Sequence, residues 1–470
     1  MKTLVEKFNI QIWLGFLFII RLFGITNAPL ETGHNWRQSL TASIARNFLE
    51  VDPNIFFPRV DIAGDLTGII GSEFPIFNFL IYLMSAALGY EHWYGRLINL
   101  VVSSVGIWAF YELIRKTIHK ETAVYSAVIL SVSIFFSFSR KIMPDTFSVS
   151  LILLALYFSY LYFVKGKWLH LIGFFLFSAL GLLSKIPSLA IYSGLIYYLF
   201  FFKQKPKRVI ALYSAATLSV ILTFTWYFFW VPYLLKTYRF QLYFPKSFSE
   251  GIQEILPLWN LVLEKFYFSA FLSFAAFAFF LVGTFFLWNQ KSQALKLSLG
   301  VVTLVFFAFI IKMGSVFPLH NYYVIPFVPV MAFLAGIGIQ NITFRWKWFI
   351  LLVIIGEGIA NQQHDFFINS KNAYKLNLEL LLQQEIPGQD LIIMNGGLSH
   401  TDMYFAHRKG WSLDAGTLEV KDLKVCYEKG AKYYVEDKHK TKTLTIEAPP
   451  IYSSTDYVIY DLRVILEPLN

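Results

Sequence analysis

The chain has 470 residues, of which 56% are hydrophobic and only 15% are charged, whereas an average soluble domain carries about 25% charged residues. This composition excludes a disordered chain, a collagen-like chain and an ordinary soluble enzyme, and it favours a protein that crosses a membrane several times. The net charge of +10 does not indicate a nucleic-acid partner, because most Lys and Arg lie in short loops between apolar runs. The single cysteine, Cys426, excludes an internal disulfide and a cysteine-based zinc site.

Apolar stretches of about 20 residues, the length that crosses the hydrocarbon core, recur along the first three quarters of the chain. They predict about eleven membrane-spanning helices. These lie near residues 9–27, 93–114, 122–139, 147–164, 168–186, 188–202, 209–232, 266–288, 296–311, 322–341 and 347–361. The apolar stretch 75–88 is only about 21 Å long as a helix, so it is predicted to be interfacial or re-entrant.

The basic runs between the apolar stretches predict the topology. With the N-terminus in the cytoplasm and 75–88 not spanning, these runs all fall on the cytoplasmic side, as the positive-inside rule requires. Counting 75–88 as a span would place them all outside. We therefore expect a membrane module over 1–361, with outside loops 28–92 and 233–265, and a soluble outside domain over 362–470.

The tail is more polar than the rest, and its pattern alternates between strands and helices. Residues 391–394 form a strand pattern that ends in Gly-Gly, and 418–429 have helical spacing. Residues 433–435 and 457–460 are again strand-like. The predicted fold class is thus an all-α polytopic membrane protein with a small C-terminal α/β domain. We expect this domain to cover an outer cavity and to help select acceptors.

Ionisable residues near membrane spans are costly and are candidates for function. The first outside segment is the richest, with Glu31, His34 and Arg37 just after the first span and Glu73 before 75–88. The alternative is a solvated loop that caps a helix.

Two outside turns carry further candidates. Arg140 and Lys141 face outward against the positive-inside trend, and Asp145 opens the next helix. An acid in a first helical turn is also ordinary capping. Lys185 ends an apolar helix on the same side, where a lysine can equally extend to lipid head groups.

The last outside turn contains Lys312, His320 and Tyr322. A lone histidine is more often a structural hydrogen-bonding group than a ligand or an acid. Several cations at one membrane face suit an anionic phosphate or pyrophosphate head group.

The order of these motifs resembles the GT-C class of membrane glycosyltransferases over about residues 9–341. The nearest branch is the bacterial relatives of protein O-mannosyltransferases and of the lipid A aminoarabinose transferase, similar to glycosyltransferase family 39. The resemblance rests on Ala45-Arg46-Asn47, Glu73-Phe74-Pro75, Gly95-Arg96-Leu97, Arg140 with Pro144-Asp145, residues 181–185, and His320-Asn-Tyr-Tyr with Pro326 and Pro329.

The resemblance implies a reaction. Such enzymes transfer a sugar from a polyprenyl-phosphate donor to an acceptor glycan, lipid or protein on the outer face of a bacterial inner membrane, typically with inversion. Where the family usually carries an Asp-Glu pair, this chain has Arg37-Gln38. Glu31, His34 and Glu73 are therefore the nearest candidates for the work of that pair.

The resemblance also suggests roles for the other residues. Asp145 matches the family's second outside acid, and Arg37 and Tyr322 would position substrate. The candidates for binding the donor phosphate are Arg140, Lys141, Lys185, Lys312 and His320. No dedicated metal motif is present, although a divalent ion could bridge a carboxylate to phosphate.

Two other functional classes share some of these features. A transporter or flippase of lipid-linked glycans would have the same basic outer pocket, but it would also show repeat-related interrupted helices, which are not evident here. A catalytically inactive GT-C-like subunit would account for the missing Asp-Glu pair.

Overall fold

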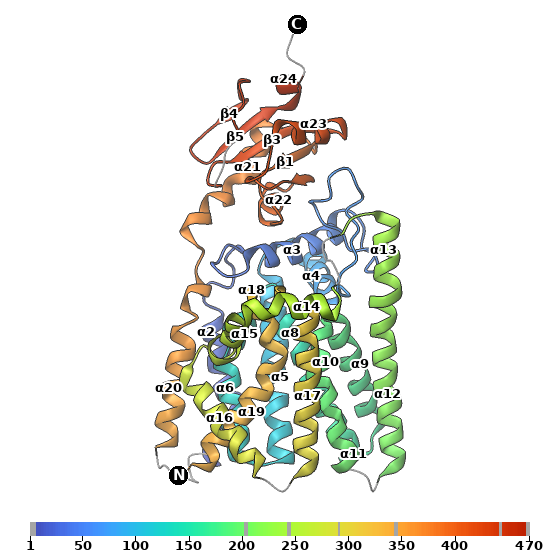
Figure 1. The fold of residues 1–470 in the computed structure, drawn as a ribbon, viewed down its shortest axis with the longest axis vertical. Coiled ribbons are helices and arrows are strands. Elements are labelled where there is room, and N and C mark those ends of the chain that lie inside the picture. Colours follow the sequence, from blue (N-terminus) through green and yellow to red (C-terminus); the bar gives the residue numbers. More distant parts are fainter. Residues whose placement is uncertain are drawn as a thin grey trace. The chain divides into compact units, whose positions relative to one another are not determined.

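The computed structural model describes residues 6–201, 205–241, 246–289, 292–342, 346–440 and 444–466. The chain forms two compact units (Figure 1). We call the first the helical unit; it comprises Met1–Ile25, Arg96–Phe229 and Phe244–Phe366. We call the second the mixed unit; it comprises Thr26–Gly95, Trp230–Tyr243 and Phe367–Asn470.

The longer α-helices make up most of the helical unit. They are α2 (Ile10–Arg21), α5 (Tyr94–Thr117), α6 (Lys120–Val132), α8 (Pro144–Lys165), α9 (Trp168–Ser184), α12 (Pro206–Thr225), α16 (Phe274–Trp288), α17 (Gln293–Met313), α19 (Val328–Asn341) and α20 (Lys347–Ala360).

Short helical pieces connect them. These are α7 (Phe135–Phe138), η1 (Ile186–Ser188), α10 (Leu189–Tyr192), η2 (Ser193–Ile196), α11 (Tyr197–Phe201), η3 (Trp226–Trp230), α14 (Phe248–Ile255), η4 (Leu256–Leu258), α15 (Trp259–Glu264), η5 (Lys265–Ser269), α18 (Val316–Leu319), η6 (Asn321–Phe327) and η7 (Gln363–Phe366).

Five continuous helices within the described residues are long and apolar enough to cross a membrane. They are Tyr94–Thr117, Pro144–Lys165, Pro206–Tyr238, Gln293–Met313 and Asn321–Asn341. A sixth candidate, Phe248–Ser269 with Phe274–Trp288, is bent by 96° at its break. Several shorter apolar helices, such as α2 and α9, fall where spans are predicted, so the count of about eleven spans stays a prediction.

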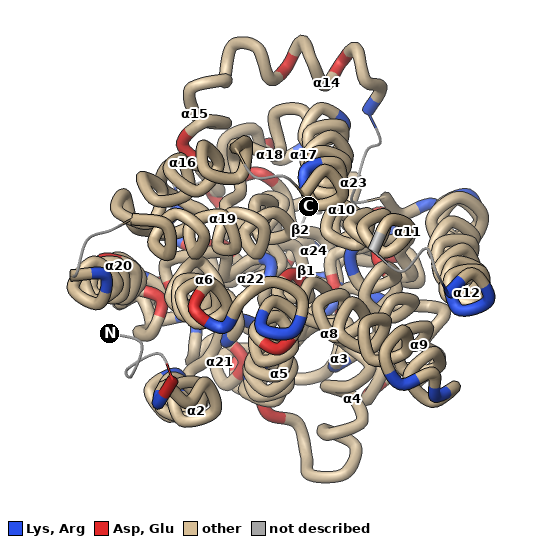
Figure 2. The backbone as a smooth tube through the Cα atoms, turned by 90° about the horizontal axis from the view of Figure 1, so that it is seen from below, with Lys and Arg blue, Asp and Glu red and all other residues tan. Residues whose placement is uncertain are grey.

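Basic residues mark one end of the helical unit. Figure 2 shows Lys and Arg gathered at the near ends of α5, α9 and α12. Arg115 and Lys116 lie in the last turn of α5, and Lys165 lies in the last turn of α8. Arg208 of α12 donates to the carbonyl of Phe163 at 2.5 Å. This clustering is what the positive-inside rule leads us to expect at a cytoplasmic face.

Small residues allow α19 to pack closely against its neighbours. A Cβ added at Gly336 would lie 2.1 Å from Ser126 Oγ of α6. On the other side, a Cβ at Gly338 would lie 2.2 Å from the carbonyl oxygen of Phe279 in α16, and one at Gly283 would lie 1.7 Å from that of Leu334. Such close backbone approach is typical of helix packing in membranes.

The mixed unit combines helices with a sheet. Its helices are α3 (Asn35–Glu50), α4 (Ile76–Leu88), α13 (Val231–Tyr238), η8 (Ser370–Asn377), α21 (Leu378–Glu385), α22 (Thr401–Ala406), α23 (Val420–Glu428) and α24 (Leu462–Leu466). Its strands are β1 (Leu391–Met394), β2 (Gly410–Ser412), β3 (Ala431–Asp437), β4 (Tyr452–Ser453) and β5 (Tyr457–Asp461).

The described strands form one sheet with the order β2-β1-β3-β5-β4. β1 pairs in parallel with β2 and β3, whereas β5 runs antiparallel to both β3 and β4. The predicted strands at 391–394, 433–435 and 457–460 and the helix within 418–429 are all present. The predicted fold class, a helical membrane protein with a small α/β sheet near its C-terminus, is therefore confirmed.

The tail sheet shares its core with the segment that follows α2. Ala28, Leu30 and Ala42 belong to the same buried cluster as Ile392 and Val435 of the sheet. Residues 61–64 continue this contact, because Gly410 donates to the Asp61 carbonyl at 3.0 Å and accepts from Gly64 at 2.7 Å.

Candidate functional site

The turn before α8 is fixed by one side chain, Asn99 of α5. Its amide nitrogen donates to three carbonyls of that turn at distances between 2.9 and 3.1 Å. Its amide oxygen accepts from Thr146 Oγ1 at 3.0 Å. Pro144 then occupies the first helical position, where its fixed φ favours helix initiation. Asp145, in the first turn of α8, consequently has a defined position.

Asp145 and Lys185 form a buried pair in the helical unit. Asp145 is only 4% exposed, and its Oδ1 lies 3.6 Å from Nζ of Lys185. The ammonium also lies 5.6 Å from the ring centroid of Tyr322 and 5.9 Å from that of Tyr323, within the range of a cation–π contact. Asp145 Oδ2 is buried and has no hydrogen-bond partner among the described residues. This oxygen can therefore accept a proton or bind a hydroxyl group or a cation.

The backbone around Lys185 is held by the packing of α8 on α9. Ser148 Oγ of α8 donates to the Gly181 carbonyl at 2.6 Å and lies 2.6 Å from Ser188 Oγ. A Cβ at Gly181 would lie 2.7 Å from Ile152, so glycine allows this approach. Lys185 follows the last residue of α9 in an extended conformation and joins it to η1.

The motif around His320 carries a second polar group, which we did not predict. The His320 ring stacks on Tyr322 with centroids 5.3 Å apart. The neighbouring Asn321 accepts from Nζ of Lys265 at 2.6 Å, and Lys265 also pairs with Glu264 at 2.9 Å. Lys265 begins the π-helical turn η5, a distortion frequent at functional sites. A Glu-Lys pair inside an apolar, aromatic run was the sequence signal that could have identified it.

Arg140 and Lys141 make their described contacts with protein groups of the helical unit. The Arg140 guanidinium donates to the carbonyls of Arg21, Phe23 and Asp365 at 2.7–3.1 Å. Lys141 Nζ lies 2.8 Å from Asp365 Oδ1. Burial alone would raise the pKa of Asp365, but Lys141 lowers it below its ordinary value. Donor-phosphate binding by Arg140 and Lys141 therefore stays a prediction.

Lys312 is exposed and lies against the segment that begins α14. Its ammonium donates to the carbonyl of Lys246. Lys246 in turn pairs with Glu254, which also accepts from the Ser315 amide at 2.8 Å. Within the described residues, the contacts of Lys312 thus connect it to α14, and its predicted phosphate role is untested.

In the mixed unit, the first turns of α3 bring together the residues predicted for the first outside segment. Gln38 Nε2 donates to Oε2 of the buried Glu31 at 3.0 Å. Arg37 forms an ion pair with Glu73. His34 is the N-cap residue of α3, with a left-handed φ of 60°. The residues that stand where the family has Asp-Glu therefore each bind a carboxylate of the same outside segment.

His400 lies in the same unit and was not predicted from the sequence. It directly precedes α22 and is 3% exposed. Burial, with a smaller contribution from the positive charge of Arg37, lowers its pKa to about 3. The next residue, Thr401, lies 3.5 Å from Ser39 of α3, which connects this loop to the helix that carries Arg37. The signal that could have found His400 was its place just after a predicted strand and Gly-Gly turn.

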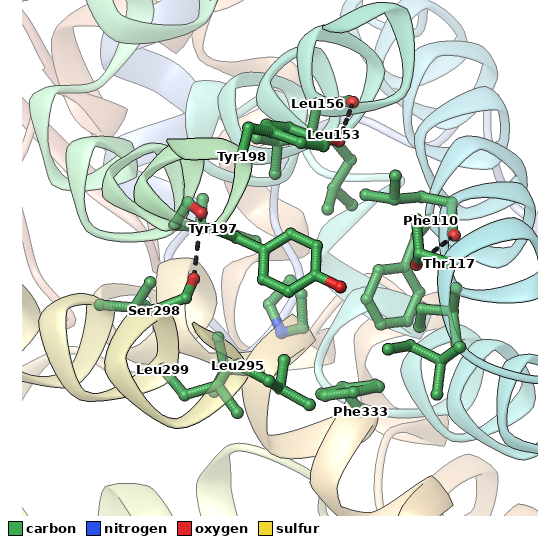
Figure 3. A pocket seen from close by; sticks show the side chains of 18 residues that line it. Phe110, Thr117, Leu153, Leu156, Tyr197, Tyr198, Leu295, Ser298, Leu299 and Phe333 are labelled. Carbon is green, nitrogen blue, oxygen red and sulfur yellow. Dashed lines mark hydrogen bonds between the residues drawn. The ribbon is translucent and has the colours of Figure 1, made fainter. Parts of the chain in front are cut away.

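A small apolar cavity lies inside the helical unit (Figure 3). Its volume is about 140 Å³, and α5, α8, α17 and α19 contribute to its wall together with residues 191–198. Figure 3 shows Phe110, Tyr197 and Phe333 among the side chains that line it. Aliphatic side chains outnumber these rings, so the wall is mainly aliphatic.

The structure gives no support for a dedicated metal centre among the residues it describes. It places no three His, Cys, Asp or Glu side chains together as a protein metal site would need. In the Asp145 pair, one carboxylate oxygen is available. A divalent ion that bridges a carboxylate to phosphate stays a prediction.

Comparison with known proteins supports the resemblance. Residues 72–229 match the family described as dolichyl-phosphate-mannose-protein mannosyltransferase. A curated relative, an uncharacterized protein of Aquifex aeolicus (strain VF5), is 29% identical over 266 residues, which is 53% of this chain and 50% of that protein. The chain thus spans about half the length of this relative in the match.

Solved structures match most of the chain. ArnT from Cupriavidus metallidurans in the apo state has a TM-score of 0.64 at 12% identity, covering 95% of this chain and 97% of ArnT. The same enzyme bound to undecaprenyl phosphate gives a TM-score of 0.63 with the same identity and coverage. The Archaeoglobus fulgidus oligosaccharyltransferase AglB, in complex with an inhibitory peptide and a dolichol-phosphate, gives 0.54 at 13% identity, covering 90% of this chain and 69% of AglB. The chain therefore has the GT-C fold, as the resemblance of its motifs predicted.

Proposed function

We propose that this chain is an integral-membrane glycosyltransferase that moves a sugar from a polyprenyl-phosphate donor to an acceptor on the extracytoplasmic face. The family match over residues 72–229 and the GT-C fold support this class of reaction. ArnT binds undecaprenyl phosphate and AglB binds a dolichol-phosphate in their structures, which supports a polyprenyl-phosphate carrier here.

The observation that carries the proposal is the buried Asp145–Lys185 pair, in which one carboxylate oxygen has no hydrogen-bond partner among the described residues. In the reaction, an acceptor hydroxyl attacks the anomeric carbon of the sugar, and the bond from that carbon to the carrier phosphate breaks. The departing phosphate takes the electron pair, so a fixed cation nearby lowers the barrier. We assign this role to Lys185, aided by His320, and we assign the positioning of the sugar to Tyr322.

The acceptor proton needs a base within hydrogen-bond reach. Asp145 Oδ2 is one candidate because it has no hydrogen bond within the described residues. Glu31, His34 and Glu73 are the others. Arg37 pairs with Glu73, and Gln38 donates to Glu31. These contacts support the proposal that Glu31 and Glu73 supply the carboxylates that the family's Asp-Glu pair would supply.

We further propose that the protein lies in a bacterial inner membrane with its N-terminus in the cytoplasm. Basic residues lie at the ends of α5 and α8, and the positive-inside rule assigns such residues to the cytoplasmic side. The start of α8, which carries Asp145, is then extracytoplasmic. A single cysteine introduced at Lys116 should be labelled by a thiol reagent only after the membrane is permeabilised, in a Cys426→Ser background. Labelling from the outside of intact cells would reverse the orientation.

The direct test of function uses the purified full-length chain and a panel of polyprenyl-phosphate sugars. We expect release of free polyprenyl phosphate from at least one of them when a cell-envelope extract supplies acceptors. Asp145→Asn and Lys185→Gln should each slow this release by roughly 100-fold or more. Lys116→Gln, at the other end of the helical unit, is the matched control and should keep the wild-type rate. If every donor stays intact, or if both site variants keep full activity, the proposal fails.

A further inference from the structure

The tail sheet has the topology of an open α/β ligand-binding fold. From β1 the chain leads to β2 on one side, and β3 then pairs with the other edge of β1. In such sheets, ligands bind beyond the carboxyl ends of the parallel strands, at the point where the strand order reverses. Here the segment at that point is residues 395–400, which follows β1 and ends at His400.

This loop is held in place by contacts within the mixed unit. Asn395 donates to the Asp437 carbonyl at 3.1 Å and accepts from its amide at 2.8 Å, which ties the loop to the end of β3. Ser399 Oγ accepts from the Thr401 amide at 3.3 Å, and the His400 carbonyl accepts from the Tyr404 amide at 2.9 Å. The His400 side chain is therefore presented from an ordered backbone.

The His400 ring is buried, yet neither of its nitrogens has a hydrogen-bond partner among the described residues. A histidine that serves only packing normally satisfies both nitrogens, because an unsatisfied buried polar atom is costly. The nearby charge is the Arg37 cation, which together with burial keeps the ring neutral. A neutral imidazole offers one donor and one acceptor.

A hydroxyl group matches this pattern because it can accept a hydrogen bond from the protonated ring nitrogen or donate one to the unprotonated ring nitrogen. Sugars present such hydroxyls at close spacing. The surroundings are suited to them, because Thr401 Oγ1 lies 3.5 Å from Ser39 Oγ of α3 and accepts from Ser399 Oγ of the same loop at 3.0 Å. A cationic ligand would instead be repelled by Arg37.

We propose that His400 is a sugar-binding residue whose ring exchanges hydrogen bonds with a hydroxyl group of the transferred sugar or of a glycan acceptor. Only the choice between these two sources rests on the proposed glycosyltransferase function. Sugar recognition at the carboxyl edge of the tail sheet would give residues 367–470 a part in choosing the substrate.

The test measures binding of sugar probes to the full-length protein by calorimetry. Methyl glycosides of several hexoses and pentoses present the sugar as an acceptor would, and short-chain prenyl-phosphate sugars present it as the donor would. We expect His400→Phe, which keeps a planar ring but removes both nitrogens, to weaken one of these classes by roughly tenfold or more. His400→Gln, which retains a donor and an acceptor, should recover part of the loss.

The matched control is His439→Phe, because His439 is an exposed histidine of the same unit that pairs with Asp456. It should bind all probes as the wild type does.

The inference is overturned if His400→Phe binds every probe with wild-type affinity, or if the wild type binds none. Methyl glycosides can bind without any transfer of sugar, so their binding is measured independently of the proposed reaction. A chain that binds them through His400 but never releases polyprenyl phosphate would refute the proposed function alone, whereas normal release with His400-independent binding would refute this inference alone.

Discussion

Individual charged residues in this chain are buried at a cost that their partners must offset. Asp365 illustrates this for the helical unit, because it is buried against the ammonium of Lys141. Asp145 differs, since its distance to Lys185 is longer and its second oxygen lacks a hydrogen bond within the described residues. A buried carboxylate that is incompletely satisfied by protein groups is suited to a ligand that completes its contacts.

The Lys141–Asp365 pair gives a prediction on stability. Lys141→Met should leave the Asp365 carboxylate buried without its cation and should lower the free energy of unfolding by about 3–5 kcal/mol. Adding Asp365→Leu should restore much of this loss, because the double variant replaces the pair with apolar side chains. Thermal unfolding of the three variants in detergent measures the difference. If the double variant melts no higher than Lys141→Met, the pair is not the source of the effect.

Two histidines of the mixed unit predict opposite dependences of stability on pH. Burial, aided by Arg37, lowers the pKa of His400 from 6.5 to about 3, so the unfolded chain binds the extra proton first. The unit should therefore lose roughly 1.4 kcal/mol per pH unit as pH falls from 6.5 toward 3. His407 lies between Glu50 and Glu379, and Glu50 raises its pKa. Its stabilising contribution is complete below pH 6.5 and is lost as pH rises through the raised pKa.

Melting temperatures of the full chain measured from pH 4 to pH 9 separate the two. We expect His400→Phe to flatten the acid side of the profile, and His407→Gln to flatten the alkaline side. Identical profiles for wild type and both variants would show that neither ring titrates in this way.

At the scale of elements, backbone proximity rather than side-chain bulk joins the helices around α19. Gly283 of α16 and Gly338 of α19 face backbone atoms of the opposite helix, so neither position has room for a side chain. In lipid, such contacts are a main source of helix association because lipid tails are as apolar as the side chains they would replace.

Gly283→Leu should therefore separate α16 from α19 and lower the melting temperature of the protein. Gly300→Leu is the control, because it lies in α17 and a Cβ there would meet no atom within 4 Å. Yield of monodisperse protein in detergent and its melting temperature are the measurements. Equal behaviour of the two variants would contradict the close α16–α19 contact.

Patterns in the sequence predicted the helices and strands better than they predicted which side chains contact one another. The strands at 391–394 and 457–460 were evident because their apolar runs are bounded by turn residues. The proximity of Asp145 to Lys185 was predictable because Asp145 begins one apolar helix and Lys185 follows the end of another on the same side. The pairing of Lys141 with Asp365 was not, because those residues are far apart in sequence and no local pattern encodes the contact.

His400 and Lys265 were missed for different physical reasons. His400 stands in a polar loop, where a histidine is usually solvated, and only the tertiary fold buries it. Lys265 follows an amphipathic segment, and its bond to Asn321 depends on the π-helical turn η5. In both cases the burial and the contacts of the side chain depend on long-range packing.

At the scale of the whole molecule, the mixed unit is assembled from distant parts of the chain. Residues 26–95 and 367–470 share one apolar cluster, and Asn369 donates to the Leu30 carbonyl at 2.9 Å. A tail that folds in this way depends on the segment after the first helix, which is also the segment that carries Glu31 and Arg37. Changes that weaken this association should therefore affect the candidate acids and the tail sheet together.

Gly64 provides the sharpest test of this association. Its φ of +63° favours glycine, and a Cβ there would lie 2.3 Å from Nε1 of Trp411. Gly64→Val should therefore separate residues 61–64 from β2 and lower the free energy of unfolding of the mixed unit by about 2–4 kcal/mol. Gly89→Val is the matched control, because its φ of +86° imposes a similar backbone strain without any atom within 4 Å of a Cβ.

Hydrogen exchange on the full-length chain reports the effect where it should occur. We expect the amides of β1 and β2 to exchange faster in Gly64→Val than in Gly89→Val, and Trp411→Ala to restore part of the protection by removing the clash. Because residues 26–95 carry Glu31 and Arg37, the faster amide exchange in Gly64→Val should extend to the first turns of α3. If exchange changes only at residues 61–64 while β1, β2 and α3 keep wild-type protection, the tail and the segment after α2 do not fold as one cooperative unit.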